Sequence, residues 1–469
     1  MKVKKIYFFI WIIIASLLLY MYPITDDDFY LFSFGQNIKN GLIPYLDYNM
    51  LVTPLCAYII AFFTLFLDNI LVIKILWILC TVIICIYIDK ILKKFIDGDF
   101  IVFLISATIS LTMSLFSNFT YNLILVAWAL FIYDYIINLE VENISFKNIL
   151  FLSTFLFLGI LLKQTLGLIL FATAMFSLFI IAIKEKKYKY YFCKILIITF
   201  ITFIYCLLFF VLLYFMGNLN EFIEQTILGV SSFNSDGVIE SIMFIYVFLV
   251  INVVILIYTF WHKKCNLNYF ILIIFSLTQL MGLYPLPNLS HLIFSLFFSV
   301  VVWVIFLKDI LGKYFNYFVK IAVLVCGIFL IAETYNIYTD TEIVMSSQKY
   351  FVGGLISKEK EDNINLLNDY IENNKENKYY MITENSMMVN MNRDVYYKYY
   401  DLFFDGNLGR NNPVELIKKI ENDYIIIYTD PTKDFWQIPV DALEYIRTLQ
   451  KVDEIGPYSI YTNKFKTGN

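Results

Sequence analysis

Apolar residues in this chain come in long uninterrupted runs, separated by short segments that hold most of the charges. A helix of about 20 apolar residues can cross the roughly 30 Å hydrocarbon core of a membrane. Runs close to this length predict membrane-spanning helices, and the first of them lie at 6–22, 70–88, 100–116, 119–138, 166–183 and 195–216. Similar runs continue to about residue 339. We therefore expect an α-helical polytopic membrane protein.

The pattern changes near residue 340, where short amphipathic helical stretches begin to alternate with short β-rich ones. The helical stretches are DNINLLNDYIENN, NPVELIKKIEN and DALEYIRTLQ, and the β-rich ones are KYYMITE, DYIIIYTD and YSIYT. Such an alternation predicts a small α/β domain. The expected division is a membrane domain over residues 1–339 and an α/β domain over residues 340–469.

Composition and charge support a membrane protein and exclude several classes of partner. Hydrophobic residues make up 60% of the chain, and the mean hydropathy is +0.71, both far above the range of soluble proteins. The net charge of −4, without a P-loop, a dinucleotide fingerprint or a basic patch, predicts no nucleic-acid partner. The only two histidines, His262 and His291, are too few for a His-rich zinc site. Membrane lipids are the expected surroundings.

The basic residues predict the orientation, because Lys and Arg are retained on the cytoplasmic side of short loops. The basic loops of the membrane domain all fall on one side only if the apolar run at 51–67 does not cross. That run contains Thr53 and Pro54 near its start and is bounded by Asp47 and Asp68. As a juxtamembrane helix in the first external loop, it leaves about 11 spans in a multi-pass protein of the cell membrane. The N-terminus is then cytoplasmic and the α/β domain extracytoplasmic.

Three consecutive carboxylates, Asp26, Asp27 and Asp28, directly follow the first apolar run. Acids crowded in a partly dry crevice raise one another's pKa values, which lets a carboxylate accept a proton near neutral pH. They could also bind a divalent cation, Mg²⁺ or Mn²⁺, through Asp27 and Asp28. A simpler alternative is that outward carboxylates only keep the first helix from sliding inward.

The segment at 25–66 resembles the first external loop of the GT-C superfamily, the integral-membrane glycosyltransferases that use polyprenyl-phosphate-linked sugars. Protein O-mannosyltransferases and the lipid A aminoarabinose transferase belong to it. The matching elements are an acid pair, an aromatic residue, a turn and a Pro-containing helix, in the same order: Asp26 and Asp27, Tyr30, Gly41 with Pro44 and Tyr45, and Pro54. The resemblance implies a GT-C-like fold, Asp26 as the general base, Asp27 as a residue that orients the acceptor or binds a cation, and Tyr30 in the substrate site.

Lys163 stands between two apolar runs, in the sequence Lys163-Gln164-Thr165. A lysine at the centre of a membrane is unfavourable by about 2.5 to 3.5 kcal/mol and by less near the interface. Its ammonium group could therefore extend to the lipid headgroups. Alternatively it could bind the phosphate of a lipid-linked donor. The superfamily has a similar lysine at a similar external corner, so the resemblance implies that Lys163 and Gln164 bind the donor.

Further polar residues stand at other expected external corners. Several superfamily members have an acid near the start of the fourth span, where this chain offers Asn122, which can bind hydroxyls but cannot act as a base. Tyr284 and His291 could contact sugar or phosphate, although a histidine hydrogen-bonded at a helix start is an equal alternative. Gln279 and Glu224 are expected to be structural more than functional.

These expectations describe an inverting transfer of a sugar from a polyprenyl-phosphate donor to a glycan, lipid or protein acceptor of the cell envelope. Two other classes stay open. A transporter or flippase of lipid-linked saccharides would more often show inverted repeats with broken helices, and none is visible in the sequence. A non-catalytic membrane sensor with an external ligand-binding domain would not need an acid cluster in the first loop.

Overall fold

The computed structural model describes residues 2–139, 144–229, 238–262, 264, 266–283, 289–383, 385–393, 403, 408–429 and 439–463. The chain divides into two compact units. The first unit contains Met1–Tyr22, Lys74–Leu212 and Ser235–Ile337, and the second contains Pro23–Ile73, Leu213–Asn234 and Tyr338–Asn469. The second unit therefore combines the C-terminal region with two segments from the membrane region of the sequence. A division of the chain at residues 339 and 340 stays a prediction about domains.

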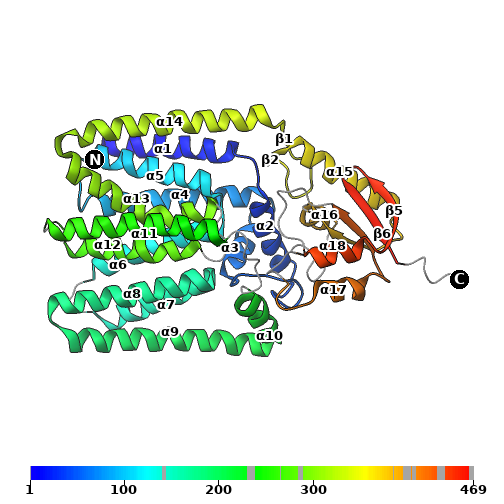
Figure 1. Ribbon diagram of the computed structural model, residues 1–469, viewed down its shortest axis with the longest axis horizontal. Helices are drawn as coiled ribbons and strands as arrows, with labels where there is room; N and C mark the ends of the chain where they lie inside the picture. Colours follow the sequence, from blue (N-terminus) through cyan, green and yellow to red (C-terminus); the bar gives the residue numbers. More distant parts are fainter. Residues whose placement is uncertain are drawn as a thin grey trace. The chain divides into compact units, whose positions relative to one another are not determined.

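The first unit is a helical bundle, and Figure 1 shows its long helices running side by side. Its described part has eleven α-helices: α1 (Lys2–Met21), α4 (Leu71–Leu92), α5 (Asp99–Ser117), α6 (Tyr121–Ile137), α7 (Phe146–Leu162), α8 (Gln164–Glu185), α9 (Tyr188–Met216), α11 (Val238–Trp261), α12 (Leu267–Gln279), α13 (Leu289–Leu311) and α14 (Phe315–Asp340). Five stretches of the described residues are long and apolar enough to cross a membrane, or up to six if Ile6–Met21 is counted with Asp26–Lys39. The last of the five, Ser290–Asp340, contains both α13 and α14. The protein is a helical membrane protein, as the apolar runs predict.

Basic residues gather at one end of this bundle. The helices alternate in direction along the chain (Figure 1), and lysines stand near the starts of α1, α7 and α9 and near the ends of α4, α8 and α13. Asp134 partly balances this charge, because its carboxylate lies 3.9 Å from Lys90 Nζ and 3.7 Å from Lys94 Nζ. The one-sided distribution is the pattern that retention of basic loops on the cytoplasmic side produces.

The second unit begins with two helices from the first loop, α2 (Asp26–Lys39) and α3 (Leu55–Thr64). They pack closely at Gly35, where an added Cβ would lie 2.4 Å from Ile60 Cγ2. At 10 residues, α3 is about 15 Å long, half of the roughly 30 Å needed to cross a membrane. This length is consistent with the predicted non-crossing run. The sequence did not predict α2, because we expected a loop after the acid cluster.

Two short helical segments of the second unit hold the first loop in place, α10 (Leu219–Phe222) and a π-helix (Ile223–Leu228). Gln225 Oε1 accepts a hydrogen bond from the Met50 backbone N–H at 2.8 Å. Asn218 Nδ2 donates to the Pro44 carbonyl at 2.9 Å. Tyr45, in the turn that resembles the GT-C loop, is fully buried. Segments distant in the sequence therefore fix this turn.

The rest of the second unit is an α/β structure with a four-stranded sheet in the order β3-β4-β6-β5. Strands β3 (Tyr379–Ile382) and β4 (Ile425–Thr429) are parallel, whereas β6 (Tyr458–Thr462) is antiparallel to β4 and to β5 (Gln450–Ile455). Ile427 pairs with Ile460 in the interior of the sheet. A separate antiparallel hairpin precedes it, β1 (Ile343–Met345) and β2 (Leu355–Ser357).

Four helices accompany the sheet: α15 (Lys358–Asn373), α16 (Ser386–Asn392), α17 (Pro413–Ile420) and α18 (Val440–Ile446). The three β-rich stretches predicted from the sequence correspond to β3, β4 and β6, and the three predicted helical stretches correspond to α15, α17 and α18. The α/β prediction is therefore confirmed. Strand β5 was not predicted, because its sequence, QKVDEI, is mostly polar and exposed at the sheet edge.

Candidate functional site

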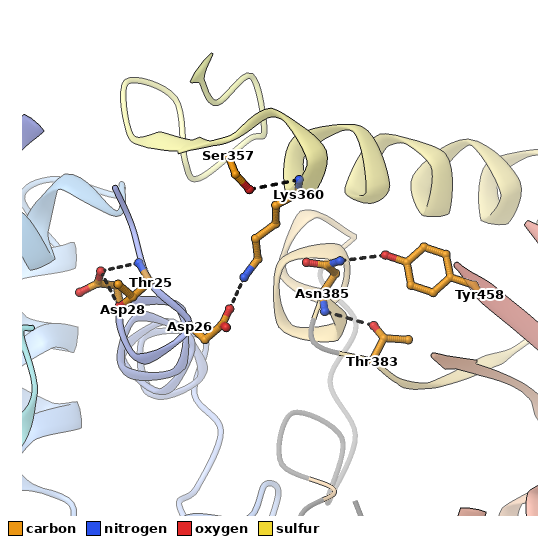
Figure 2. A network of polar contacts seen from close by, with 8 residues as sticks. All are labelled: Thr25, Asp26, Asp28, Ser357, Lys360, Thr383, Asn385 and Tyr458. Atoms are coloured by element: carbon orange, nitrogen blue, oxygen red, sulfur yellow. Dashed lines mark hydrogen bonds and ion pairs between the residues drawn. The ribbon is translucent and has the colours of Figure 1, made fainter. Parts of the chain in front are cut away.

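The acid cluster forms the first turn of α2, in the second unit. Thr25 precedes the helix, and Asp28 Oδ2 accepts hydrogen bonds from the Thr25 backbone N–H at 2.8 Å and from Thr25 Oγ1 at 3.1 Å (Figure 2). Asp28, at the third position of the helix, thus bonds back to the residue that precedes the helix, as in a capping box. Carboxylates near a helix N-terminus are also stabilised by the helix dipole. Asp28 is fully buried. One of the three acids, Asp28, therefore caps the N-terminus of the helix.

Asp26 forms an ion pair with Lys360, a residue that the sequence did not single out (Figure 2). Lys360 lies in the first turn of α15, where its backbone N–H donates to Ser357 Oγ at 3.3 Å. Its Nζ also lies 4.8 Å from the centre of the Phe29 ring. These contacts hold the ammonium group beside Asp26. The pair links positions 334 residues apart in the sequence.

Asp27, the third acid of the cluster, neither caps the helix nor forms an ion pair with a described residue. It forms no hydrogen bond or ion pair with any residue that the structure describes. Desolvation raises its pKa to about 7, and repulsion from Asp28 and Asp26 adds to the shift. Asp27 is also exposed. Asp27 can therefore take up and release a proton near neutral pH.

The acid cluster was also predicted to bind a divalent cation through Asp27 and Asp28. Successive residues of an α-helix point about 100° apart, and the Asp28 carboxylate already caps the helix. Among the described ranges, no group of three His, Cys, Asp or Glu side chains is placed to hold a metal ion. The described residues therefore do not complete such a site, and the metal assignment stays a prediction.

Lys163 lies in the first unit, as the single residue between α7 and α8. Its backbone is extended, with φ −156° and ψ 118°. The two helices approach so closely beyond this corner that a Cβ on Gly167 would lie 2.3 Å from the Gly159 carbonyl oxygen. The Lys163 carbonyl accepts a hydrogen bond from the Gly167 N–H at 2.8 Å. The missing side chain at residue 167 thus allows the tight corner that presents Lys163.

The Lys163 side chain is buried in the bundle, with 7% of its surface exposed. Its Nζ donates to Asn122 Oδ1 at 3.0 Å and lies 5.2 Å from the centre of the Tyr121 ring. Asn122 is placed by the start of α6, where its backbone N–H donates to Thr120 Oγ1 at 3.2 Å. The ammonium group therefore meets an amide oxygen and an aromatic face inside the protein, and it does not extend to lipid headgroups.

A small cavity lies beside this pair, within the first unit. Its volume of about 10 Å³ is close to what a single water molecule occupies. The polar residues that line it are Asn122, Gln279, His291 and Ser295, and the remaining lining is Leu125, Val126, Leu166, Gly282 and Phe294. Three of the four polar residues were named from the sequence. These residues lie on α6, α12 and α13, and a local sequence pattern cannot show that these three helices meet.

The other sequence candidates have separate surroundings. Tyr30 lies on α2, with its ring centre 4.4 Å from that of Phe34. Gln164 is the first residue of α8 and does not line the cavity. Glu224 accepts a hydrogen bond from Arg410 Nε at 2.8 Å, and this arginine lowers the pKa of the carboxyl group. Tyr284 lies outside the described residues.

Comparison with known proteins identifies the fold. No protein-family model and no curated protein matches the chain. Among solved structures, it is similar to the Archaeoglobus fulgidus oligosaccharyltransferase, which was crystallised in complex with Zn and sulfate. The TM-score is 0.50 at 10% sequence identity, and the match covers 89% of this chain and 68% of the other. The chain therefore has a fold similar to that of this oligosaccharyltransferase.

Proposed function

We propose that this protein is a membrane glycosyltransferase that moves a sugar from a polyprenyl-phosphate-linked donor to an acceptor on the outer face of the membrane. The GT-C-like fold, similar to that of an oligosaccharyltransferase, supports the reaction class. The observation that carries the proposal is Asp27, an accessible carboxylate with a pKa raised to about 7. A group of this kind suits a general base.

The base is assigned to Asp27 in preference to Asp26, which the family resemblance favoured. Asp26 is ion-paired with Lys360, and Asp28 caps α2. Both neighbours strengthen the affinity of Asp27 for a proton through their negative charges. Asp26 thus supports the base, and Tyr30, one turn later on the same helix, stays a proposed contact to the substrate.

The proposed reaction is a single displacement that inverts the anomeric carbon. An oxygen or nitrogen of the acceptor forms a bond to this carbon while its proton passes to Asp27. The bond between the carbon and the phosphate oxygen breaks, and its electron pair stays with the departing phosphate. Base assistance contributes about 10² to 10⁴-fold in rate. No step is assigned to a metal.

Lys163 is proposed to stabilise the phosphate as it departs. A well-placed donor at a developing negative charge contributes about 2.7 to 4 kcal/mol. Asn122 holds the ammonium group in place, and His291 and Gln164 stay proposed contacts to the donor, as does Tyr284. The activated donor supplies the energy, so the reaction needs no nucleotide and suits the outer face. The orientation follows from placing the lysine-rich end of the bundle on the cytoplasmic side.

The proposal is tested with the purified full chain in detergent. The probes are radiolabelled decaprenyl-phosphate sugars, offered one at a time with an envelope extract as acceptor, with and without a chelator. We expect release of decaprenyl phosphate and labelled acceptor with at least one sugar, and both at a rate about 10² to 10⁴-fold lower with Asp27→Asn. A transporter would move the donor across a vesicle membrane without releasing the phosphate. Transport without release, or an Asp27→Asn variant as active as the wild type, would contradict the proposal.

A further inference from the structure

A dense group of lysines surrounds the connection between α8 and α9, at the lysine-rich end of the first unit. We call residues 184–194 the α8–α9 corner. Their sequence, KEKKYKYYFCK, holds five lysines and one glutamate, a net charge of +4. Lys184, Lys186 and Lys189 are exposed, and none of these three forms an ion pair with a residue that the structure describes. The corner therefore presents exposed positive charge that no described carboxylate pairs with.

Several lysines elsewhere at this end of the bundle are offset by carboxylates. The Asp309 carboxylate lies 3.9 Å from Lys264 Nζ and 3.9 Å from Lys308 Nζ. Asp134 lies 3.7 Å from Lys94 Nζ. Because the orientation of a membrane protein depends on the number of Lys and Arg residues and little on nearby acids, paired lysines serve it equally well. The unpaired charge of the α8–α9 corner thus exceeds what orientation requires and points to an anionic partner.

The length and exposure of α9 place this corner at the membrane surface. The helix has 29 residues and is about 44 Å long, which matches the roughly 40 to 45 Å thickness of a bilayer with its headgroup regions. Figure 1 shows α9 at the edge of the bundle, and only 11% of its apolar span is buried within the protein. The first turn of α9, with Tyr188 and Lys189, therefore lies at the depth of the lipid headgroups.

Lys189 stands at the head of an exposed apolar face of α9. Phe192, Leu196 and Phe200 follow it by three, seven and eleven residues, a spacing that places the four side chains on one side of the helix. The three apolar side chains are 58%, 51% and 64% exposed. An ammonium group at the end of an apolar face matches a molecule with an anionic headgroup and an acyl chain.

We propose that the α8–α9 corner binds the headgroup of an anionic phospholipid, with the charge of phosphatidylglycerol, whose acyl chain lies along the exposed face of α9. Lys184, Lys186 and Lys189 supply the positive charge. A soluble phosphate lacks the acyl chain that the apolar face would contact, so the membrane is the source of the ligand. This inference goes beyond the proposed function, because no group assigned to sugar transfer takes part.

Lipid binding to the purified full chain in detergent tests this site. Native mass spectrometry gives the apparent Kd of the first bound dioleoyl phosphatidylglycerol, with dioleoyl phosphatidylcholine and inorganic phosphate as comparison probes. A lysine near an anionic lipid surface strengthens binding by about fivefold. We therefore expect Lys184→Gln, Lys186→Gln and Lys189→Gln, combined in one variant, to weaken binding of phosphatidylglycerol by about 10- to 100-fold and to leave that of phosphatidylcholine unchanged. Arginine at the same three positions keeps the charge and should preserve binding.

A control variant changes the net charge by the same amount elsewhere. It combines Lys358→Gln, Lys375→Gln and Lys418→Gln, at lysines of the second unit that are paired with glutamates, and should bind phosphatidylglycerol as the wild type does. If the corner variant does not fold, as judged by its melting temperature, Lys189→Gln alone should weaken binding by about fivefold.

Three results would overturn the site. They are undiminished binding of phosphatidylglycerol by the corner variants, an equal loss in the control variant, and equally tight binding of phosphatidylcholine by the wild type. Displacement of the lipid by millimolar inorganic phosphate would overturn the lipid as the ligand. Each of these results leaves the proposed function standing, because sugar transfer is measured separately.

Discussion

The two polar regions of this protein handle charge in opposite ways. The acid cluster at the start of α2 places three carboxylates in one helical turn, and only one of them, Asp28, is fully buried. The Lys163 region places a single ammonium group inside the bundle, with an amide and an aromatic ring as its contacts. Crowded carboxylates raise one another's pKa values, whereas the Lys163 ammonium group is held in position by a hydrogen bond to Asn122.

This difference suits two separate chemical tasks. A base must change its protonation state during a reaction, so its pKa should lie near the working pH. A group that stabilises a departing phosphate should keep its charge and position throughout. Asp27 meets the first requirement, and Asn122 fixes the position of the Lys163 ammonium group. Variants of Asp27 and Lys163 test this division of roles.

Replacing the proposed base should have the largest effect. We expect Asp27→Asn to lower the rate of sugar transfer by about 10² to 10⁴-fold, because it removes the proton acceptor and keeps the shape of the side chain. Asp26→Asn is the matched control, since its carboxylate is already paired with Lys360, and it should lose much less activity. Single-turnover transfer rates measure both. A larger loss in Asp26→Asn would return the role of base to that residue.

Removing the buried charge should have the next largest effect. We expect Lys163→Met to lower kcat/KM for the donor by about 100- to 1,000-fold, which corresponds to about 2.7 to 4 kcal/mol of transition-state stabilisation. Lys163→Arg keeps the charge and should retain more activity. Equal loss in the two variants would show that the packing of Lys163 matters and its charge does not.

The corner that presents Lys163 should be sensitive to a single methyl group. A Cβ at residue 167 would lie 2.3 Å from the Gly159 carbonyl oxygen, so Gly167→Ala must separate α7 from α8. We expect a loss of stability of about 1 to 3 kcal/mol, measured by thermal unfolding in detergent at a fixed scan rate. Gly327→Ala adds the same methyl group in open space on α14 and should not lower the melting temperature, because alanine is more favourable than glycine inside a helix.

Ionisation of Asp27 should lower the stability of the folded protein as the pH rises. The pKa of Asp27 is about 7 in the folded protein, against an ordinary value of 3.8. Between these values the unfolded chain has lost the proton while the folded protein still holds it, so stability falls as the pH increases. Asp27→Asn removes this dependence. It should therefore melt at a higher temperature than the wild type at pH 8 and at a similar temperature at pH 4, and a lower temperature at pH 8 would contradict the shift.

Replacing Lys360 with Met should have the smallest effect, a shift in the pH profile of sugar transfer. Without its ammonium group, the charge of Asp26 acts more strongly on Asp27, and the pH at half-maximal transfer should rise by less than about one unit. Lys358→Met is the control, because Lys358 pairs with Glu342 at 2.9 Å on the surface. A downward shift in Lys360→Met would mean that Asp26 does not raise the proton affinity of Asp27.

The sequence predicts the architecture better than the contacts that form the sites. Long apolar runs predict the helices of the first unit because burial in lipid requires them, and alternating short segments predict the α/β part. Helix α2 was missed because its acidic first turn suggested a loop, although Thr25 and Asp28 form a capping box. The positions of Asn122, Lys163 and His291 in the sequence predict them as site residues. The sequence contained no sign of the Lys360 contact, which depends on the packing of the second unit.

The pH dependence of sugar transfer tests the central claim most directly. For the wild type, kcat/KM should rise with pH through a midpoint at about 7 as Asp27 loses its proton. This rise should be absent from the residual activity of Asp27→Asn and present in Asp26→Asn. A wild-type midpoint near the ordinary aspartate value of 3.8, or an unchanged profile in Asp27→Asn, would contradict Asp27 as the base.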